Sequence, residues 1–206
     1  MTDPSEAFET ALLALDRVGA RTILEGVLDG GSPIQRIETV VVPALERIGK
    51  AWETGELSLA QVYMAGRLCE DAVGAITSTD HPARPNAPRT AVAVLDDYHF
   101  LGKRMVYAVL RSGGYSPLDY GRVTVDELVA RVNEDRIDVV FISTLMYPSA
   151  LRVKEVCAKL TGTPVRVVVG GAPFRCDPEL WKDVGAHDCG SSASDVLRML
   201  SAWETP

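Results

Sequence analysis

Side chains suited to metal or proton chemistry lie in the loop formed by residues 96–102, DDYHFLG. His99 follows the carboxylate of Asp97 by two residues, and Gly102 comes three residues later. A carboxylate that accepts a hydrogen bond from one ring nitrogen fixes the histidine tautomer and leaves the other nitrogen free for a metal ion or a proton. The loop has neither the glycine-rich dinucleotide fingerprint nor the phosphate-loop spacing, so it does not indicate a nucleotide cofactor. A single loop histidine is more often solvated than ligating, so this pattern alone assigns no function.

Two further loops carry weaker signals of the same kind. Residues 143–149 read STLMYPS, in which Ser143 suits the end of a strand and Ser149 suits a helix cap. Residues 170–173 read GGAP, which is typical of a turn leaving a strand or of backbone that a bulky ligand can approach closely. Each loop by itself has an ordinary structural explanation. Their occurrence in order, each after an expected strand, indicates a shared site.

The elements that must position these loops follow from the hydrophobic pattern after residue 89. Apolar, β-branched runs at 90–95, 138–143 and 165–169 predict strands buried on both faces, and weaker strands are expected at 116–120 and 186–189. Helical patterns alternate with them at 103–111, 125–133, 150–160 and 195–203. This alternation predicts a flavodoxin-like (Rossmann-type) α/β domain with a five-stranded parallel sheet. Its ligand is expected beyond the carboxyl ends of the strands, between the first and third strands.

The first part of the chain has a different period. Apolar residues recur at helical spacing over residues 1–78, which predicts a bundle of four or five helical segments. Ser58 and Gln61 form a capping-box pattern, and Pro43 is expected to kink or split the third helix. Residues 81–89, HPARPNAPR, read as a proline-rich linker. We therefore expect a helical bundle domain at 1–80, a linker at 81–89 and the α/β domain at 90–206.

Composition excludes several classes of protein. The 206 residues carry a formal net charge of -7, which argues against a nucleic-acid binder. The sequence has no basic and apolar leader and no apolar run long enough to span a bilayer, so we expect a cytoplasmic protein without a membrane partner. The four cysteines are widely spaced and form no C-x-x-C pair, so neither a zinc site nor an iron–sulfur site is indicated.

The loop motifs together resemble the cobalamin-binding signature of methionine synthase and its relatives. The segment at 43–59, PALERIGKAWETGELSL, also resembles the helical cap that precedes the cobalamin-binding domain in that family. The two resemblances cover nearly the whole chain, as in the stand-alone corrinoid proteins of methyltransferase systems. The matching motifs are D-x-H-x-x-G at Asp97, His99 and Gly102, S-x-L at Ser143 and Leu145, and G-G at Gly170 and Gly171.

The resemblance implies a role for each matched residue. His99 would replace the cofactor's own nucleotide base as the lower ligand of cobalt, with Asp97 on the other ring nitrogen and Ser149 completing a hydrogen-bonded relay. Gly102 would leave room for the displaced nucleotide tail, and Ser143, which shares the S-x-L motif with Leu145, would hydrogen-bond the base. The pair Gly170 and Gly171 would line the far wall. The helical cap would cover the upper face of the corrin.

The function implied is that of a methyl carrier, not of a complete enzyme. The partners implied are a substrate-specific methyltransferase, an acceptor methyltransferase and a reductive activator protein. Two alternatives remain open. One is a cobalamin-dependent sensor, although the light-sensing members of that class carry Glu-His where this chain has Val62 and Tyr63. The other is the small subunit of an adenosylcobalamin mutase, which usually lacks the cap. A phosphoryl-accepting receiver is disfavoured, because Ser143 and Thr144 stand where its phosphorylated Asp would be.

Overall fold

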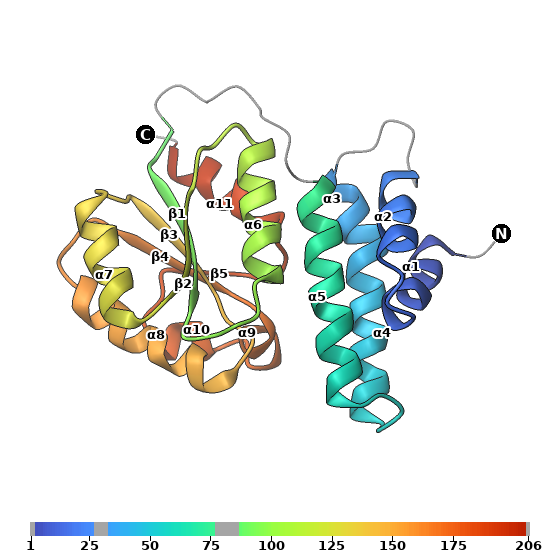
Figure 1. Ribbon diagram of the computed structural model, residues 1–206. Coiled ribbons are helices and arrows are strands. Elements are labelled where there is room, and N and C mark those ends of the chain that lie inside the picture. Colours follow the sequence, from blue (N-terminus) through green and yellow to red (C-terminus); the bar gives the residue numbers. More distant parts are fainter. Residues whose placement is uncertain (1–2, 27–32, 77–86, 205–206) are drawn as a thin grey trace. The chain divides into compact units, whose positions relative to one another are not determined.

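The computed structural model describes residues 3–26, 33–76 and 87–204 (Figure 1). The chain divides into two compact units, Met1–Thr79 and Asp80–Pro206, and each is described by itself. Most of the predicted linker lies outside the described residues.

The first unit is helical, as its sequence period predicts. Asp3 caps its first helix by accepting the backbone N–H of Ser5 at 3.1 Å, and Arg47 joins the first and fourth helices through an ion pair with Glu9 at 2.5 Å. The unit's core contains Phe8, Leu12, Leu24, Ile48, Leu68 and Val73, all buried. Its elements are α1 (Pro4–Leu13), α2 (Arg17–Gly26), α3 (Pro33–Arg36), the π-helical turn η1 (Ile37–Val41), α4 (Val42–Glu53) and α5 (Leu59–Ile76).

Two local predictions for this unit can be compared with the structure. The irregularity expected at Pro43 takes the form of η1, after which α4 begins at Val42 with the proline in its first turn. The ring at this position has no N–H to donate to the preceding turn, which favours a change of helical type there. The capping box is formed, because Ser58 N–H donates to Gln61 Oε1 at 2.9 Å and Gln61 N–H donates to Ser58 Oγ at 3.3 Å.

The second unit is a doubly wound sheet, which confirms the predicted fold class (Figure 1). All strand pairs are parallel, and the order is β2-β1-β3-β4-β5. Figure 1 shows α6 and α11 on one face of the sheet and α7 and α8 on the other. The strands are β1 (Thr90–Leu95), β2 (Leu118–Val123), β3 (Val139–Ser143), β4 (Arg166–Gly170) and β5 (Asp188–Gly190). The helices are α6 (Leu101–Ser112), α7 (Val125–Glu134), α8 (Tyr147–Leu160), α9 (Ala172–Cys176), α10 (Leu180–Asp183) and α11 (Asp195–Glu204).

The sheet brings three strand ends to one edge. In the parallel register Val94 of β1 lies beside Ser143 of β3, and Ser143 lies beside Gly170 of β4. The β1–α6, β3–α8 and β4–α9 loops therefore leave the sheet side by side. Because β1 lies between β2 and β3, the chain turns in opposite directions after β1 and β3, and this is the place where ligands bind in such sheets.

Candidate functional site

The centre of the site is the buried carboxylate of Asp97, which is hydrogen-bonded to the imidazole of His99. His99 Nδ1 lies 2.5 Å from Asp97 Oδ1, and the same oxygen accepts the backbone N–H groups of Tyr98 at 2.7 Å and His99 at 3.2 Å. Partial burial alone would raise the pKa of Asp97, but these bonds and those from Met146 and Leu145 outweigh it and lower the pKa. An ionised carboxylate only accepts hydrogen bonds, so Nδ1 must carry the ring proton and Nε2 holds the free lone pair.

The same carboxylate joins two loops that are about fifty residues apart. Asp97 Oδ2 accepts the backbone N–H of Leu145 at 2.8 Å and that of Met146 at 2.9 Å, both from the β3–α8 loop. Asp97 is 2% exposed, whereas the His99 side chain is 45% exposed. The buried residue thus fixes the loops, and the exposed ring is available to a ligand.

Ser149 differs from its expected role. Its Oγ donates to the backbone carbonyl of Asp96 at 3.0 Å, so it does not complete a relay through the carboxylate of Asp97. The physical reason is that Oδ2 of Asp97, the oxygen turned away from His99, is already occupied by two backbone donors. Ser149 instead holds the backbone immediately before Asp97.

Three matched glycines lie where a side chain would disturb this edge. A Cβ atom on Gly102 would stand 2.6 Å from Ser143 Oγ, which shows that the first turn of α6 lies against the end of β3. Gly171 has φ +123° and its Cβ would stand 1.8 Å from the carbonyl oxygen of Thr144. Gly170 is less constrained, with its nearest contact at 3.3 Å. Small residues therefore keep the three loops close together.

Two further features were not predicted from the sequence. Thr144 Oγ1 is buried beside Gly171 and has no hydrogen-bond partner among the described residues, which is unusual for a buried hydroxyl and suits a polar group of a ligand. Lys103, 6% exposed, places Nζ 2.5 Å from both carboxylate oxygens of Asp119 and so ties the first turn of α6 to β2. The sequence signals were slight: a threonine inside the S-x-L motif, and a lysine directly after Gly102.

The surroundings of His99 are apolar and open. Five large apolar side chains of these loops and of α8 are exposed, as expected of a surface that a large ligand covers. Within the described residues no group of three or more His, Cys, Asp or Glu could hold a metal ion. A half-exposed imidazole beside exposed apolar side chains fits a large cofactor with apolar faces. The exposed apolar residues are Tyr98, Leu145, Met146, Tyr147 and Leu151.

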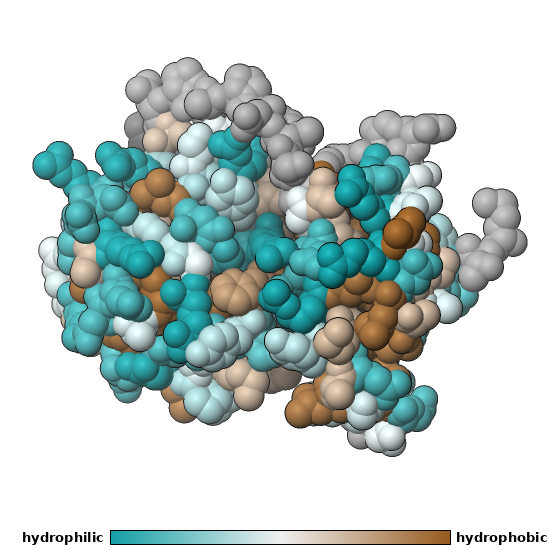
Figure 2. All heavy atoms as spheres, in the orientation of Figure 1, coloured by the Kyte–Doolittle hydropathy of each residue, from teal (hydrophilic) through white to brown (hydrophobic). Residues whose placement is uncertain are grey.

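The helical unit also presents apolar side chains to solvent. Trp52 near the end of α4 is half exposed, and Leu59, Tyr63 and Met64 in the first turns of α5 are similarly uncovered. Figure 2 shows hydrophobic side chains gathering on this unit, including the end at which α4 leads into α5. A monomeric bundle rarely leaves such a patch without a binding partner or ligand.

Fold and site together define an α/β protein that binds a large cofactor at the carboxyl edge of its sheet. Comparison with known proteins identifies that cofactor. Two family profiles, each described as a B12 binding domain, match residues 5–77 and residues 90–198. The chain belongs to this B12-binding family, and its cofactor is cobalamin.

The similar proteins are corrinoid proteins. The trimethylamine corrinoid protein of Methanosarcina barkeri is 27% identical over 197 residues, which covers 91% of this chain and 89% of that protein. Dimethylamine corrinoid protein 1 of Methanosarcina mazei is 30% identical over 175 residues, which covers 80% of this chain and 79% of the relative. The resemblance to corrinoid proteins of methyltransferase systems is thereby confirmed.

Solved structures confirm the fold. The monomethylamine corrinoid protein of Methanosarcina barkeri superposes with a TM-score of 0.80 at 19% identity, covering 95% of this chain and 96% of that chain. A methanol:cobalamin methyltransferase complex from the same organism gives a TM-score of 0.52 at 21% identity, covering 97% of this chain and 79% of that chain. Within the described ranges, no helix combines the length and apolar character needed to cross a bilayer.

Proposed function

We propose that this protein is a corrinoid methyl carrier that binds cobalamin with His99 as the lower ligand of cobalt. Bound cobalamin supplies the cobalt centre at which a methyl group is accepted and then released. The observation that carries the proposal is the pairing of His99 Nδ1 with the buried Asp97 carboxylate, because it turns Nε2 outward with its lone pair available. The names of the relatives, which are methylamine corrinoid proteins, support the methyl-transfer role.

The remaining site residues have supporting tasks in this proposal. Asp97 holds the proton at Nδ1 of His99, which makes the lone pair of Nε2 a better ligand for cobalt and keeps the ring oriented. Ser143 hydrogen-bonds the displaced nucleotide base of the cofactor. Gly102 leaves room for the nucleotide tail to reach Ser143, and Gly170 and Gly171 line the far wall of the cofactor site. Leu145 contributes its backbone N–H to Asp97 and its exposed side chain to the apolar rim.

We assign the helical domain to residues 1–80, the linker to 81–89 and the cobalamin-binding domain to 90–206. The exposed apolar residues at the α4–α5 end of the helical domain are suited to contact a large apolar ligand. The partners are a substrate-specific methyltransferase, an acceptor methyltransferase and a reductive activator protein. A complex that contains a cobalamin methyltransferase is among the structures of similar fold, which supports a methyltransferase partner.

The proposal is tested by loading the purified protein with cobalamin and recording EPR spectra of the Co(II) form. A histidine ligand adds hyperfine splitting from one nitrogen, and labelling histidine with ¹⁵N changes that splitting. The splitting is expected in wild-type protein and absent in His99→Ala. His187→Ala is the matched control, because that ring accepts the N–H of Val167 and directly precedes β5, at the opposite edge of the sheet from the carboxyl ends of the strands.

Methyl transfer distinguishes the carrier from other cobalamin proteins. The Co(I) form is mixed with a methylamine and candidate methyltransferases, and the appearance of a methylcobalamin absorption spectrum is followed. Transfer that requires both a partner and His99-bound cofactor supports the carrier. Histidine coupling without any methyl transfer, together with turnover of an adenosylcobalamin-dependent isomerase partner, would instead favour the mutase subunit.

A further inference from the structure

Asp96, the residue immediately before the Asp97–His99 pair, has an unusual backbone conformation. Its φ is +46°, and only two other residues besides glycine, Leu15 and Arg136, have positive φ in the described part of the chain. In this region Cβ approaches the neighbouring carbonyl oxygen, which disfavours it for residues other than glycine, although aspartate tolerates it better than most. Such a conformation persists only where surrounding contacts enforce it.

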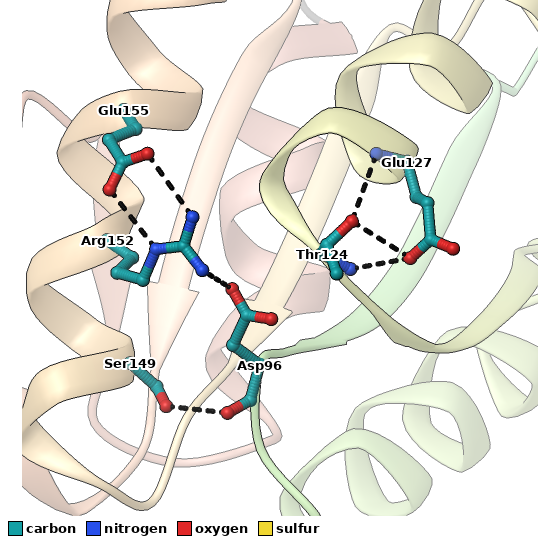
Figure 3. A network of polar contacts seen from close by, with 6 residues as sticks. All are labelled: Asp96, Thr124, Glu127, Ser149, Arg152 and Glu155. Carbon is teal, nitrogen blue, oxygen red and sulfur yellow. Dashed lines mark hydrogen bonds and ion pairs between the residues drawn. The ribbon is translucent and has the colours of Figure 1, made fainter.

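Those contacts engage both backbone polar groups of Asp96 and its carboxylate. Its backbone N–H donates to the carbonyl of Val123 at 2.9 Å, and its carbonyl accepts the Ser149 hydroxyl at 3.0 Å. Its carboxylate, whose side chain is 15% exposed, is ion-paired with Nη1 of Arg152. Figure 3 shows Ser149 and Arg152 reaching Asp96 from the same side, both from α8.

Arg152 is itself held in place from the other direction. Its Nε donates to Glu155 Oε1 at 3.1 Å and its Nη2 donates to Glu155 Oε2 at 3.3 Å, so the planar guanidinium is fixed by a two-point contact (Figure 3). A lone exposed ion pair contributes little to stability. Here one guanidinium connects two carboxylates, and the inner carboxylate belongs to a residue with a strained backbone. We call Ser149, Arg152 and Glu155 the Asp96 brace.

The direction in which the chain enters the site depends on Asp96. The dihedral angles of this residue set where Asp97 and His99 lie, and a rotation of about 20° would move an atom about 4 Å away by more than about 1 Å. A displacement of that size is enough to spoil a ligand's geometry. Asp97 is also held by the N–H groups of Leu145 and Met146, so these two bonds and the Asp96 brace together fix its position.

We propose that Arg152 is a positioning residue, which acts through Asp96 to aim His99 at the cobalt of bound cobalamin. This inference rests on the proposed ligation by His99. Ser149 takes part through the Asp96 carbonyl, in place of the relay expected from its motif. The brace thereby couples the placement of α8 to the lower face of the cofactor site.

The test compares Arg152→Gln with Lys159→Gln. Lys159 lies on the same helix and makes an exposed ion pair with Asp126 at 2.6 Å, so its substitution removes a charge and a pair without touching Asp96. Co(II) EPR of loaded protein gives the ratio of histidine-ligated to unligated cobalt. We expect this ratio to fall by about threefold to tenfold in Arg152→Gln and to stay within experimental error in Lys159→Gln. Arg152→Lys, which cannot hold both carboxylates in a planar fork, should lie between them.

A second background separates positioning from simple stability. Glycine adopts φ +46° without strain, so Asp96→Gly removes the need for the brace while keeping the conformation available. Arg152→Gln is therefore expected to cause no further loss of histidine ligation when combined with Asp96→Gly. The same measurement in Asp96→Ala, which keeps the strain and loses the carboxylate, should show the loss that Arg152→Gln shows. Cobalamin affinity measured by titration should follow the same order.

The outcomes are distinguishable from those of the proposed function. Wild-type protein without histidine coupling refutes the ligation by His99 and with it this inference. Wild-type coupling that survives unchanged in Arg152→Gln refutes the positioning role alone, even if Arg152→Gln lowers the unfolding temperature. An equal loss in Arg152→Gln with and without Asp96→Gly would also refute it, because the arginine would then act through another contact.

Discussion

Asp97→Asn is the substitution whose effect can be worked out most fully from the structure. The carboxylate accepts hydrogen bonds at both oxygens: three on Oδ1, from Tyr98 N–H, His99 N–H and the His99 ring, and two on Oδ2, from Leu145 and Met146. An amide has one oxygen that accepts and one NH₂ group that only donates. Whichever way the amide is placed, two partly buried backbone N–H groups lose their acceptor. Each loss costs about 1–3 kcal/mol, so we expect the free energy of unfolding to fall by about 2–6 kcal/mol.

The amide also changes the histidine tautomer. If its oxygen serves Leu145 and Met146, its NH₂ group faces His99 Nδ1, which can then only accept. The ring proton moves to Nε2, and the lone pair expected to bind cobalt is lost. Ligation should therefore fall by more than the stability change alone would cause.

Two measurements test this reasoning. Urea unfolding of the cofactor-free protein gives the change in free energy, and ¹⁵N NMR of the labelled ring reports which nitrogen is protonated. Asp138→Asn is the control, because that carboxylate accepts one backbone N–H, from Arg89 at 2.7 Å, which an amide oxygen can replace. A loss below about 0.5 kcal/mol would show that the hydrogen-bond account of the site is wrong, whereas the ring tautomer shows which way the amide is placed.

Three further predictions concern the neighbouring loops. Gly171→Ala should lower the free energy of unfolding by about 3 kcal/mol or more in urea, because its Cβ would stand 1.8 Å from the Thr144 carbonyl oxygen at φ +123°. Gly162→Ala, at φ +84° with open space around it, should cost only about 1 kcal/mol, and equal losses would contradict the clash. Thr144→Val should leave the cofactor-free protein equally stable or more stable by up to about 1 kcal/mol, because the buried hydroxyl has no partner there. It should weaken cobalamin binding measured by titration. An unchanged affinity would show that the hydroxyl does not contact the cofactor. For Asp195, burial opposes ionisation, but hydrogen bonds from Ser192, Ser191 and Arg198 outweigh it and lower the pKa to about 2, from 3.8. Because the pKa of Asp195 is lower in the folded state, its stabilisation is complete above about pH 4 and is lost as the pH falls towards about 2. The unfolding temperatures of wild type and Asp195→Asn should therefore converge over that range. Curves that stay parallel would show that folding does not stabilise the carboxylate.

Much of the sheet could be predicted because its strands are buried on both faces. All six residues of β1 are buried, and such continuous apolar runs stand out in the sequence. The edge strand β2 was predicted at 116–120 and lies at Leu118–Val123. Its buried and exposed residues alternate irregularly, because the register shifts opposite Val92 and Val94 and Gly121 adopts φ +65°. A bulged edge strand has too weak a hydrophobic pattern for its limits to be read.

The shortest elements could not be predicted at all. Helices α9 and α10 have five and four residues, which is hardly more than one turn, so no helical period can emerge from them. They still contribute Phe174 and Leu180 to the core. Strand β5, expected at 186–189, has three residues at Asp188–Gly190 and is limited in the same way.

The site residues also differ in how far they could be predicted from the sequence. Residues with a distinctive type and spacing, such as Asp97 and His99, were predicted and are brought together. The contacts that orient them were not, because they run from backbone N–H groups of Leu145 and Met146, and any residue other than proline has such a group. Arg152 reaches Asp96 across 56 positions, and sequence spacing carries no sign of it.

The distribution of these contacts has a consequence for how the site responds to change. Oδ2 of Asp97 and both the carbonyl and the carboxylate of Asp96 are held by residues 145–152, which form the β3–α8 loop and the first turns of α8. His99 itself makes few contacts, and its ring is largely open. The ring is held by Asp97 Oδ1 within its own loop, and that loop is tied in turn to residues 145–152. Substitutions at Ser149 or Arg152 should then alter ligation of the cofactor without touching it, whereas substitutions of the exposed Tyr98, one residue from His99, should matter less for that geometry.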